Sequence, residues 1–364
     1  MRANGRLLTF RSGGWVILLA ATVCAALTAW AVIPAAFRFA ERGPGDGQTI
    51  ESYGFDLSTC LVPRELIVPG YLHRDLVNAL VDADHMPGAD MAMYNEQIRG
   101  DYLLPGDRVL GVAIGGEARA YPVTVLNCHE IVNDTLAGTP IAVTYNPLCD
   151  SAAVFDRRVN GRVVEFGVSG LLYQSNLLMY DRTPGGGESL WSQLQARAVA
   201  GPAAAQGSAL RPLAVDVTSW SEWLARRPET TVILRRPDMI RRYKETNYTG
   251  YFRASRLMFP VDGSLTPPEM IDGLQPKSRI VMVSAGGKRR VHPIDAGERG
   301  AEETAVIEDV VGGVPVRIET SGPLDRPGVV VLADDARQAE LEVIHSFWFA
   351  WHALRPDDPA IRTP

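Results

Sequence analysis

The chain has 364 residues, of which 46% are hydrophobic and 21% are charged, and its formal net charge is -6. This length allows one large domain or two of ordinary size, and the composition excludes a disordered chain. The negative charge gives no electrostatic reason to expect nucleic acid as a partner, so we expect none.

An apolar stretch near the N-terminus predicts a membrane anchor. Arg2, Arg6 and Arg11 precede 23 uncharged residues from Trp15 to Phe37. As a helix this stretch is about 34 Å long, enough to cross the apolar core of a bilayer. The arginines favour a cytoplasmic N-terminus and a body on the periplasmic, extracytoplasmic side of the inner membrane. A cleaved signal peptide is the alternative, since residues 29–31 have the A-x-A pattern.

The composition along the chain predicts four segments. Residues 1–37 are a cytoplasmic stub and a signal anchor, or transmembrane helix. Residues 38–105 are a linker, which is Gly-rich and polar at 38–50, followed by an N-terminal extension. Residues 106–265 form a first β unit with the candidate site, and residues 266–364 form a second β unit with a C-terminal helix.

Short apolar runs after Arg108 predict β-strands, and Asn160-Gly161 between two such runs predicts a hairpin. The pattern repeats. "RVLGVAIGGEARAYPVTVL" at 108–126 parallels "RIVMVSAGGKRRVHPIDAG" at 279–297, and residues 130–148 parallel 305–324. We therefore expect a mainly β (α+β) fold of duplicated β-sheet units with a few flanking helices, preceded by one N-terminal transmembrane helix.

Two segments predict helices. "TSWSEWLARRPETTVIL" at 218–234 has Thr218 or Ser219 as a cap, Glu222 at the spacing of a capping box, and Pro228 as a stop. "EVIHSFWFAWHALRP" at 342–356 has one apolar stripe at helical spacing, which favours an amphipathic helix that covers the core.

The polar stretch "NCHEIVND" and the turn "NPLC" hold the residues best suited to chemistry. Imidazole and thiolate suit copper and zinc, so we expect His129 and Cys149 to bind copper or zinc, with Cys128 or Glu130 assisting. A disulfide between Cys128 and Cys149 is an alternative. Another is that these side chains only cap backbone groups.

Further residues are candidates for lining a pocket. They lie in "NCHEIVND", in or beside "NPLC", or in the segment "LLYQSNLLMYDRTPGGGESLWSQ", and they are Asp134, Tyr145, Asn146, Ser175, Asp181, Arg182 and Trp191. Asp181 and Arg182 precede a Gly-rich loop that would suit a lip over a pocket, or they form a surface ion pair. The sequence has no Walker motif and no dinucleotide glycine fingerprint, so we expect no nucleotide cofactor.

Four stretches resemble the DUF3179 family of exported proteins of unknown function. They are "ARAYPVTVLNCHEIVND", "VTYNPLCDSAAVFDR", "FGVSGLLYQSNLLMYDR" with "SLWSQ", and "HSFWFAW", and the resemblance runs from about residue 70 to 355. It implies an exported β-rich domain whose hallmark histidine is His129 and whose C-P-L-C turn falls on residues 146–149. The first cysteine of that turn is Asn146 here, which argues against a simple dithiol.

These observations favour a membrane-anchored exported protein that binds a transition metal, copper above all. It would serve metal handling or the maturation of an exported redox enzyme, with the membrane and an exported redox or membrane complex as partners. The alternative is a non-catalytic scaffold or subunit without a metal. A third hypothesis is a hydrolase or oxidoreductase that uses the region from His129 to Asp134.

Overall fold

The computed structural model describes residues 15–16, 18–28, 43–98, 100–183, 186–259, 261–262, 274–294, 305–322 and 327–358. The chain divides into two units, residues 1–44 and 45–364. In the first unit, residues 15–16 and 18–28 are helical. No helix among the described residues is long and apolar enough to cross a bilayer. The other residues of the predicted anchor, 17 and 29–37, lie outside the described residues.

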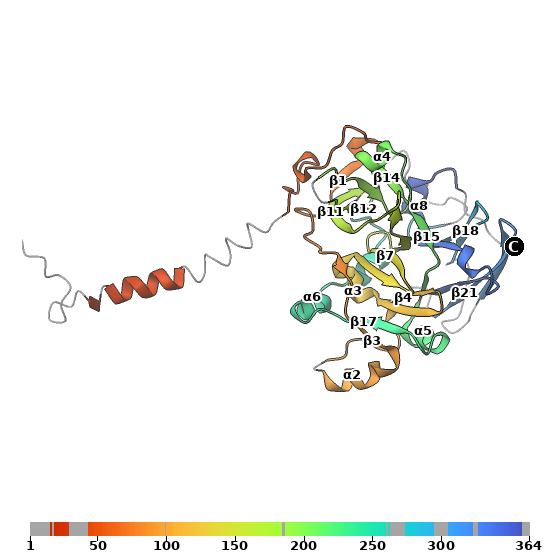
Figure 1. Ribbon diagram of the computed structural model, residues 1–364, viewed down its shortest axis with the longest axis horizontal. Coiled ribbons are helices and arrows are strands. Elements are labelled where there is room, and N and C mark those ends of the chain that lie inside the picture. Colours follow the sequence, from red (N-terminus) through yellow and green to blue (C-terminus); the bar gives the residue numbers. More distant parts are fainter. Residues whose placement is uncertain are drawn as a thin grey trace, which may run out of the picture. The chain divides into compact units, whose positions relative to one another are not determined.

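The second unit is mainly β, as predicted, and three large sheets account for most of it (Figure 1). Sheet 1 has the order β19 (Lys288–Pro293), β18 (Arg279–Ala285), β23 (Glu342–Phe347), β8 (Ser151–Asp156), β7 (Thr139–Asn146), β6 (Ile131–Leu136) and β2 (Leu80–Val81), with β15 (Arg211–Leu213) beside β8. Sheet 2 has the order β20 (Ala305–Val311), β21 (Val314–Ser321), β22 (Gly328–Leu332), β16 (Asp216–Ser219), β4 (Arg108–Ile114), β5 (Glu117–Pro122), β17 (Thr231–Ile233) and β3 (His85–Pro87).

A third sheet, the insert sheet, comes mostly from the chain between β8 and β16. Its order is β1 (Ile67–Pro69), β11 (Phe166–Tyr173), β12 (Asn176–Asp181), β13 (Leu190–Ser192) and β14 (Arg197–Ala200). The helices are short: α2 (Met91–Gln97), α3 (Val123–His129), α4 (Pro202–Ala205), α5 (Trp220–Arg226), α6 (Ile240–Glu245), α7 (Thr249–Arg253) and α8 (Trp348–Leu354).

Sheet 1 is the middle layer of the fold. Ala142 and Ala153 belong to a hydrophobic cluster with residues of the insert sheet, whereas Val143 and Val154 belong to a second cluster with residues of sheet 2. Successive residues of a strand point to opposite faces, so sheet 1 is covered on both faces. This explains why every residue of β8 is buried and why its sequence does not alternate with polar residues.

One strand pattern occurs twice in this unit. The hairpins β4–β5 and β18–β19 have the same register, because Val109 pairs with Pro122 and Ile280 pairs with Pro293. The hairpins β6–β7 and β20–β21 also correspond, each closed by a two-residue turn. We call β4–β8 and β16 repeat 1, and β18–β23 repeat 2. A helix follows the last strand of each, α5 and α8 respectively.

The two repeats share both large sheets. Sheet 1 contains β18, β19 and β23 of repeat 2 with β6, β7 and β8 of repeat 1, and sheet 2 contains the other six strands. Sheet 1 contains these strands in the order β19, β18, β23, β8, β7, β6. Sheet 2, read from its other end, contains the equivalent strands in the same order: β5, β4, β16, β22, β21, β20. Each repeat therefore contributes three strands to each sheet.

Three local predictions can be compared with the structure. Asn160 and Gly161 form the predicted turn, with φ of 49° and 77°, between β9 (Arg158–Val159) and β10 (Arg162–Val163). The predicted capping box is present at Ser219 and Glu222, at the start of α5.

The helix predicted over residues 342–356 is wrong in its first half. Residues Glu342–Phe347 form strand β23, and only Trp348–Leu354 form α8. β23 lies between β18 and β8 and is buried on both faces. A strand buried on both faces has no alternation of polar residues, so its apolar run was mistaken for a helical stripe.

Candidate functional site

The turn "NPLC" joins β7 to β8 and is closed by Asn146. The backbone N–H of Cys149 donates both to the carbonyl oxygen of Asn146, at 3.3 Å, and to its side-chain Oδ1, at 3.2 Å. The next residue, Asp150, has a φ of 43°. Asn146 thus shapes the turn through its amide, and the turn ends in a residue whose backbone is in the sparsely populated left-handed region.

Asp150 binds two arginines. Its Oδ1 accepts from Arg108 Nη1 at 2.9 Å and from the hydroxyl of Tyr145 at 2.7 Å, and its Oδ2 accepts from Arg279 Nε at 2.8 Å. Burial acts to raise the pKa of Asp150, but Arg108 and Arg279 outweigh it and lower this pKa to about 2. The carboxylate is therefore charged at any physiological pH and holds both guanidinium groups in place.

The two arginines occupy equivalent positions in the two repeats. Arg108 begins β4 and pairs with Ser219 of β16, and Arg279 begins β18 and pairs with Phe347 of β23. The site thus lies where the first strands of the two repeats approach each other, and Asp150 of repeat 1 joins them.

Both arginines line a cleft of about 350 Å³. Its other walls come from α3 and from the segment 243–253, which contains the end of α6 and all of α7. The lining residues are Gly106, Asp107, Arg108, Val123, Thr124, Asn127, Tyr145, Tyr243, Lys244, Thr246, Asn247, Tyr248, Thr249, Phe252, Arg253 and Arg279. Four of these are cationic and one is anionic, so the cleft favours a negatively charged ligand.

Several hydrogen bonds hold the segment 243–253 over the site. The hydroxyl of Tyr243 lies 2.7 Å from His129 Nε2, and the hydroxyl of Tyr251 donates to the carbonyl of Leu148 at 2.9 Å. Lys277 Nζ donates to three carbonyls at the end of α7, those of Tyr251, Ala254 and Arg256, at 2.6–3.0 Å. A lysine there stabilises the helix end, since its last carbonyls carry partial negative charge.

His129 is fully buried and both of its ring nitrogens are occupied. Nδ1 lies 2.7 Å from the carbonyl oxygen of Asn78, which can only accept, so Nδ1 carries the proton. Nε2 then accepts from Tyr243. Burial lowers the pKa of His129, so the ring is neutral at physiological pH. In this arrangement the histidine joins α3 to α6.

Glu130 ends α3 with an unusual backbone and an isolated carboxyl group. Its φ is 56°, and the hydroxyl of Tyr71 donates to Oε1 at 2.6 Å. Oε2 is buried and has no hydrogen-bond partner among the described residues. Burial raises the pKa of Glu130 to about 7, although the bond from Tyr71 acts in the opposite direction. Strained backbone and a buried, perturbed carboxyl group both occur frequently at functional sites.

The predicted cysteine ligands lie on opposite sides of sheet 1. Cys149 belongs to the hydrophobic cluster with the insert sheet and donates its thiol to the carbonyl of Ser175 at 3.1 Å, whereas Cys128 belongs to the cluster with sheet 2. Burial raises the pKa of both thiols. All four cysteines are free, so the structure contains no disulfide between Cys128 and Cys149.

Within the described residues, no group of three or more His, Cys, Asp or Glu side chains is placed to hold a metal ion. Metal binding by His129 and Cys149 stays a prediction. In the arrangement seen here it requires His129 Nε2 to leave Tyr243 and the thiol of Cys149 to leave Ser175.

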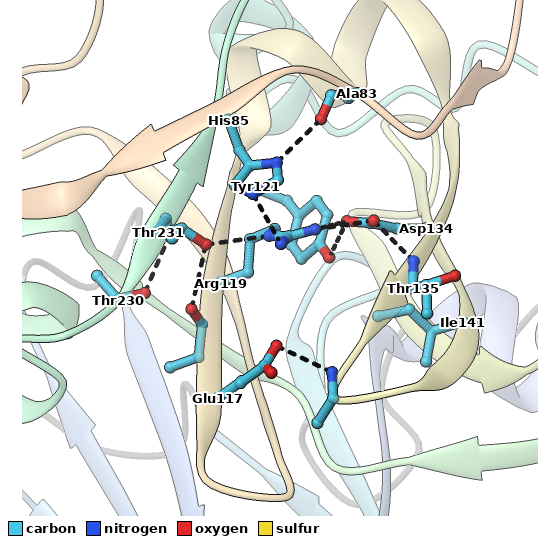
Figure 2. A network of polar contacts seen from close by, with 12 residues as sticks. Ala83, His85, Glu117, Arg119, Tyr121, Asp134, Thr135, Ile141, Thr230 and Thr231 are labelled. Atoms are coloured by element: carbon cyan, nitrogen blue, oxygen red, sulfur yellow. Dashed lines mark hydrogen bonds and ion pairs between the residues drawn. The ribbon is translucent and has the colours of Figure 1, made fainter.

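Asp134 belongs to a separate polar network in repeat 1. Figure 2 shows Arg119 between Asp134 and His85. Arg119 Nη1 donates to both oxygens of Asp134 at 2.8 and 2.7 Å, and the hydroxyl of Tyr121 donates to Oδ2 at 2.7 Å. These bonds occupy the carboxylate and account for its burial.

The other predicted pocket residues divide between two places. Tyr145, Asn146 and Ser175 lie around the "NPLC" turn, and the side-chain oxygen of Ser175 has no partner among the described residues. The rest line a second cleft of about 200 Å³ beside the insert sheet; they are Asp181, Arg182 and Trp191. Arg182 is paired there with Asp75 at 2.9 Å and with Glu165 at 2.7 Å.

Several residues of the main cleft, and the aspartate that holds its two arginines, were missed in the sequence, although signals for some of them were present. Asp150 follows "NPLC" directly, and Arg108 and Arg279 are the first residues of the two parallel stretches. Asn127 precedes Cys128 in "NCHEIVND". Nothing in the sequence indicated that Tyr248 and Phe252, more than a hundred residues later, complete the walls.

Comparison with known proteins gives one match. The model of a family described as "Protein of unknown function (DUF3179)" matches residues 83–329, most of the chain. No curated protein and no solved structure matches the chain.

Proposed function

The chain belongs to the DUF3179 family, whose description names no function, and from the geometry of its cleft we propose that the protein binds a small ligand bearing an oxyanion. The proposal rests on one observation. Two arginines at equivalent positions of the two repeats are fixed by Asp150 at the wall of a basic cleft. A guanidinium held in place is suited to carboxylate, sulfate and phosphate groups because its donors match their geometry.

The charges in the cleft support this ligand class. Asp150 neutralises one of the two arginines and Asp107 brings one negative charge to the cleft lining, whereas Lys244 and Arg253 bring two positive charges. Arg108 Nε is buried and has no hydrogen-bond partner among the described residues. An anion in the cleft would therefore meet excess positive charge and at least one unused donor.

We further propose that repeats 1 and 2 arose by duplication of one β unit. The shared registers and the equivalent positions of Arg108 and Arg279 support this proposal. A ligand site between two copies would then use one arginine from each.

The test is titration of the purified full-length protein with sulfate, by calorimetry at constant ionic strength. We expect Lys244→Ala and Arg253→Ala each to weaken sulfate binding by about three- to tenfold, the cost of one partly exposed charge. Arg241→Ala is the matched control, because this side chain lies on α6, is 90% exposed and does not line the cleft. Absence of sulfate binding, or equal effects of the three variants, would contradict the proposal.

For the location we propose a body exported to the periplasmic side and held at the inner membrane by the N-terminal segment. Three arginines before 23 uncharged residues support it. Mass spectrometry of the protein extracted from membranes tests it, with an intact N-terminus expected. A mature N-terminus near Val32 would show a cleaved signal peptide instead.

A further inference from the structure

The size of the main cleft and the residues that line it favour a ligand larger than an inorganic anion. A volume of about 350 Å³ corresponds to roughly a dozen water molecules at about 30 Å³ each. Sulfate or phosphate has five heavy atoms and would leave much of this space to solvent. Clefts of this size accommodate small organic molecules.

One wall is aromatic and is linked to the arginines by direct contacts. Tyr248 and Phe252 are stacked, with ring centroids 6.5 Å apart and an angle of 23° between the planes. Phe252 contacts Phe347 edge to face at 5.6 Å, and the guanidinium of Arg279 lies 5.3 Å from the ring centroid of Phe347. Aromatic rings lining a cleft favour a planar, unsaturated ligand body, because stacking adds to the burial of apolar area.

A third wall holds an unused hydrogen-bonding group. Asn127, near the end of α3, lines the cleft, and its side-chain oxygen is buried without a hydrogen-bond partner among the described residues. An unpaired buried amide oxygen is costly, and a ligand that donates an O–H or N–H to it would remove that cost.

We propose that the ligand of this cleft is a small aromatic or similarly planar carboxylate that also carries a hydroxyl or amino donor. This inference rests on the proposed function and names its ligand class. The carboxylate meets Arg108 and Arg279, the planar body lies against Tyr248 and Phe252, and the donor reaches Asn127. Each part of the ligand corresponds to a different wall.

The experiment compares matched compounds on the full-length protein by calorimetry. The probes are acetate, cyclohexanecarboxylate, benzoate, and the hydroxy- and aminobenzoates with the donor at each ring position. We expect benzoate to bind more tightly than acetate and cyclohexanecarboxylate. At least one donor-bearing isomer should bind about tenfold more tightly than benzoate, which is the typical gain from pairing a buried polar group.

Two variants assign these preferences to residues. Asn127→Ala should reduce the advantage of the donor-bearing isomer over benzoate to less than about twofold. Phe252→Leu should reduce the advantage of benzoate over cyclohexanecarboxylate. Arg241→Ala is the control, because this side chain is 90% exposed and does not line the cleft.

The outcomes separate the two proposals. If sulfate and acetate bind as tightly as every aromatic carboxylate, the ligand class is wrong and the anion site stands. If no anion binds, both proposals fail. If a donor-bearing isomer binds best but Asn127→Ala leaves its advantage unchanged, the assignment of the donor to Asn127 is overturned.

Discussion

Repeat 1 and repeat 2 have the same strand framework but differ in the contacts and burial of one polar cluster. In repeat 1, Arg119 and Tyr121 bind Asp134 at 2.7–2.8 Å, and the arginine and aspartate side chains are 8% and 5% exposed. The corresponding residues of repeat 2 are Arg290, His292 and Asp309. Here both contacts with the aspartate are 3.4 Å long, and Arg290 is 42% exposed.

The difference shows what each copy contributes. Repeat 1 uses its cluster to satisfy buried charges beside α3. It also supplies Asn127 and Tyr145 to the main cleft, and its Asp150 holds the two arginines that line it. Repeat 2 supplies strands to both sheets and one arginine, Arg279, to that cleft. Among the described residues, repeat 1 therefore contributes more of the main cleft than repeat 2 does.

The largest expected effect comes from breaking the buried cluster. Arg119→Met should lower the free energy of unfolding by about 3–5 kcal/mol, because Asp134 would remain buried without its cation. The matched change Arg290→Met should cost less than about 1 kcal/mol, since Arg290 is 42% exposed and its contact with Asp309 is 3.4 Å long. Urea denaturation at neutral pH measures both free energies of unfolding. Equal losses in the two variants would show that the arginine contributes equally to stability in both clusters.

A second expected effect concerns Asp216, whose equivalent in repeat 2 is Ile344. Burial raises the pKa of Asp216 to about 7, although the backbone N–H of Val331 donates to Oδ1 and acts in the opposite direction. The folded chain thus binds more protons than the unfolded chain between about pH 4 and pH 7, so stability from this group is lost as pH rises through that window.

Asp216→Asn keeps an acceptor for Val331 and removes the charge. We expect it to raise the free energy of unfolding above pH 7 by up to about 4 kcal/mol, since one pKa unit corresponds to about 1.36 kcal/mol. The gain should disappear below about pH 4. Denaturation curves between pH 4 and pH 8 measure it, and a gain that does not vary with pH would refute the titration of Asp216.

A third prediction tests the cysteine turn, which only repeat 1 possesses. Asn146→Cys should create a C-x-x-C pair with Cys149 that binds Cu(I) at least about tenfold more tightly than the wild type, or that closes as a disulfide. Thiol titration of the unfolded protein distinguishes these results, with five free thiols or three. Asn146→Ser is the control for the loss of the amide.

If Asn146→Cys has five thiols and the copper affinity of the control, "NPLC" is not a potential metal site. Cys149→Ser in the wild-type background tests the predicted metal ligand directly. Unchanged copper or zinc content in this variant would remove Cys149 from the ligand set.

The smallest expected effect concerns the helices that end the two repeats. Ser219 caps α5 through a capping box, whereas Phe347 stands at the corresponding position of α8 without a side-chain cap. Ser219→Ala should cost about 1 kcal/mol in denaturation experiments. Ser221→Ala, an exposed change in the same helix, should stay within about 0.5 kcal/mol; similar losses in both variants would argue against the cap.

The sequence was most informative where local chemistry decides the structure. Asn160-Gly161 and the pair Ser219 and Glu222 act over a few residues, so their turn and cap were predictable. The parallel between 108–148 and 279–324 was also visible. The assignment of 342–347 to a helix failed because burial on both faces, which depends on distant strands, removes the period that distinguishes a strand.

The candidate site was only partly predictable for the same reason. Of the residues selected from the sequence, Tyr145 lines the main cleft. His129 does not line it but contacts Tyr243, which does. The selection missed Arg108 and Arg279 because their importance depends on the approach of two repeats. Tyr243 and His129 are more than a hundred residues apart, so the bond that fixes the imidazole was not visible in the sequence.

The sharing of sheets between the repeats has a consequence for how the protein is made. β23 lies in sheet 1 between β18 and β8, so sheet 1 is incomplete until residues 342–347 have been synthesised. Contacts between strands far apart in sequence are slow to form, because long loops must close before the contacts can stabilise them. The growing polypeptide therefore carries the apolar β8 without its final neighbour from the synthesis of Asp156 until that of Phe347, and a chaperone that shields such strands would act on it during that interval.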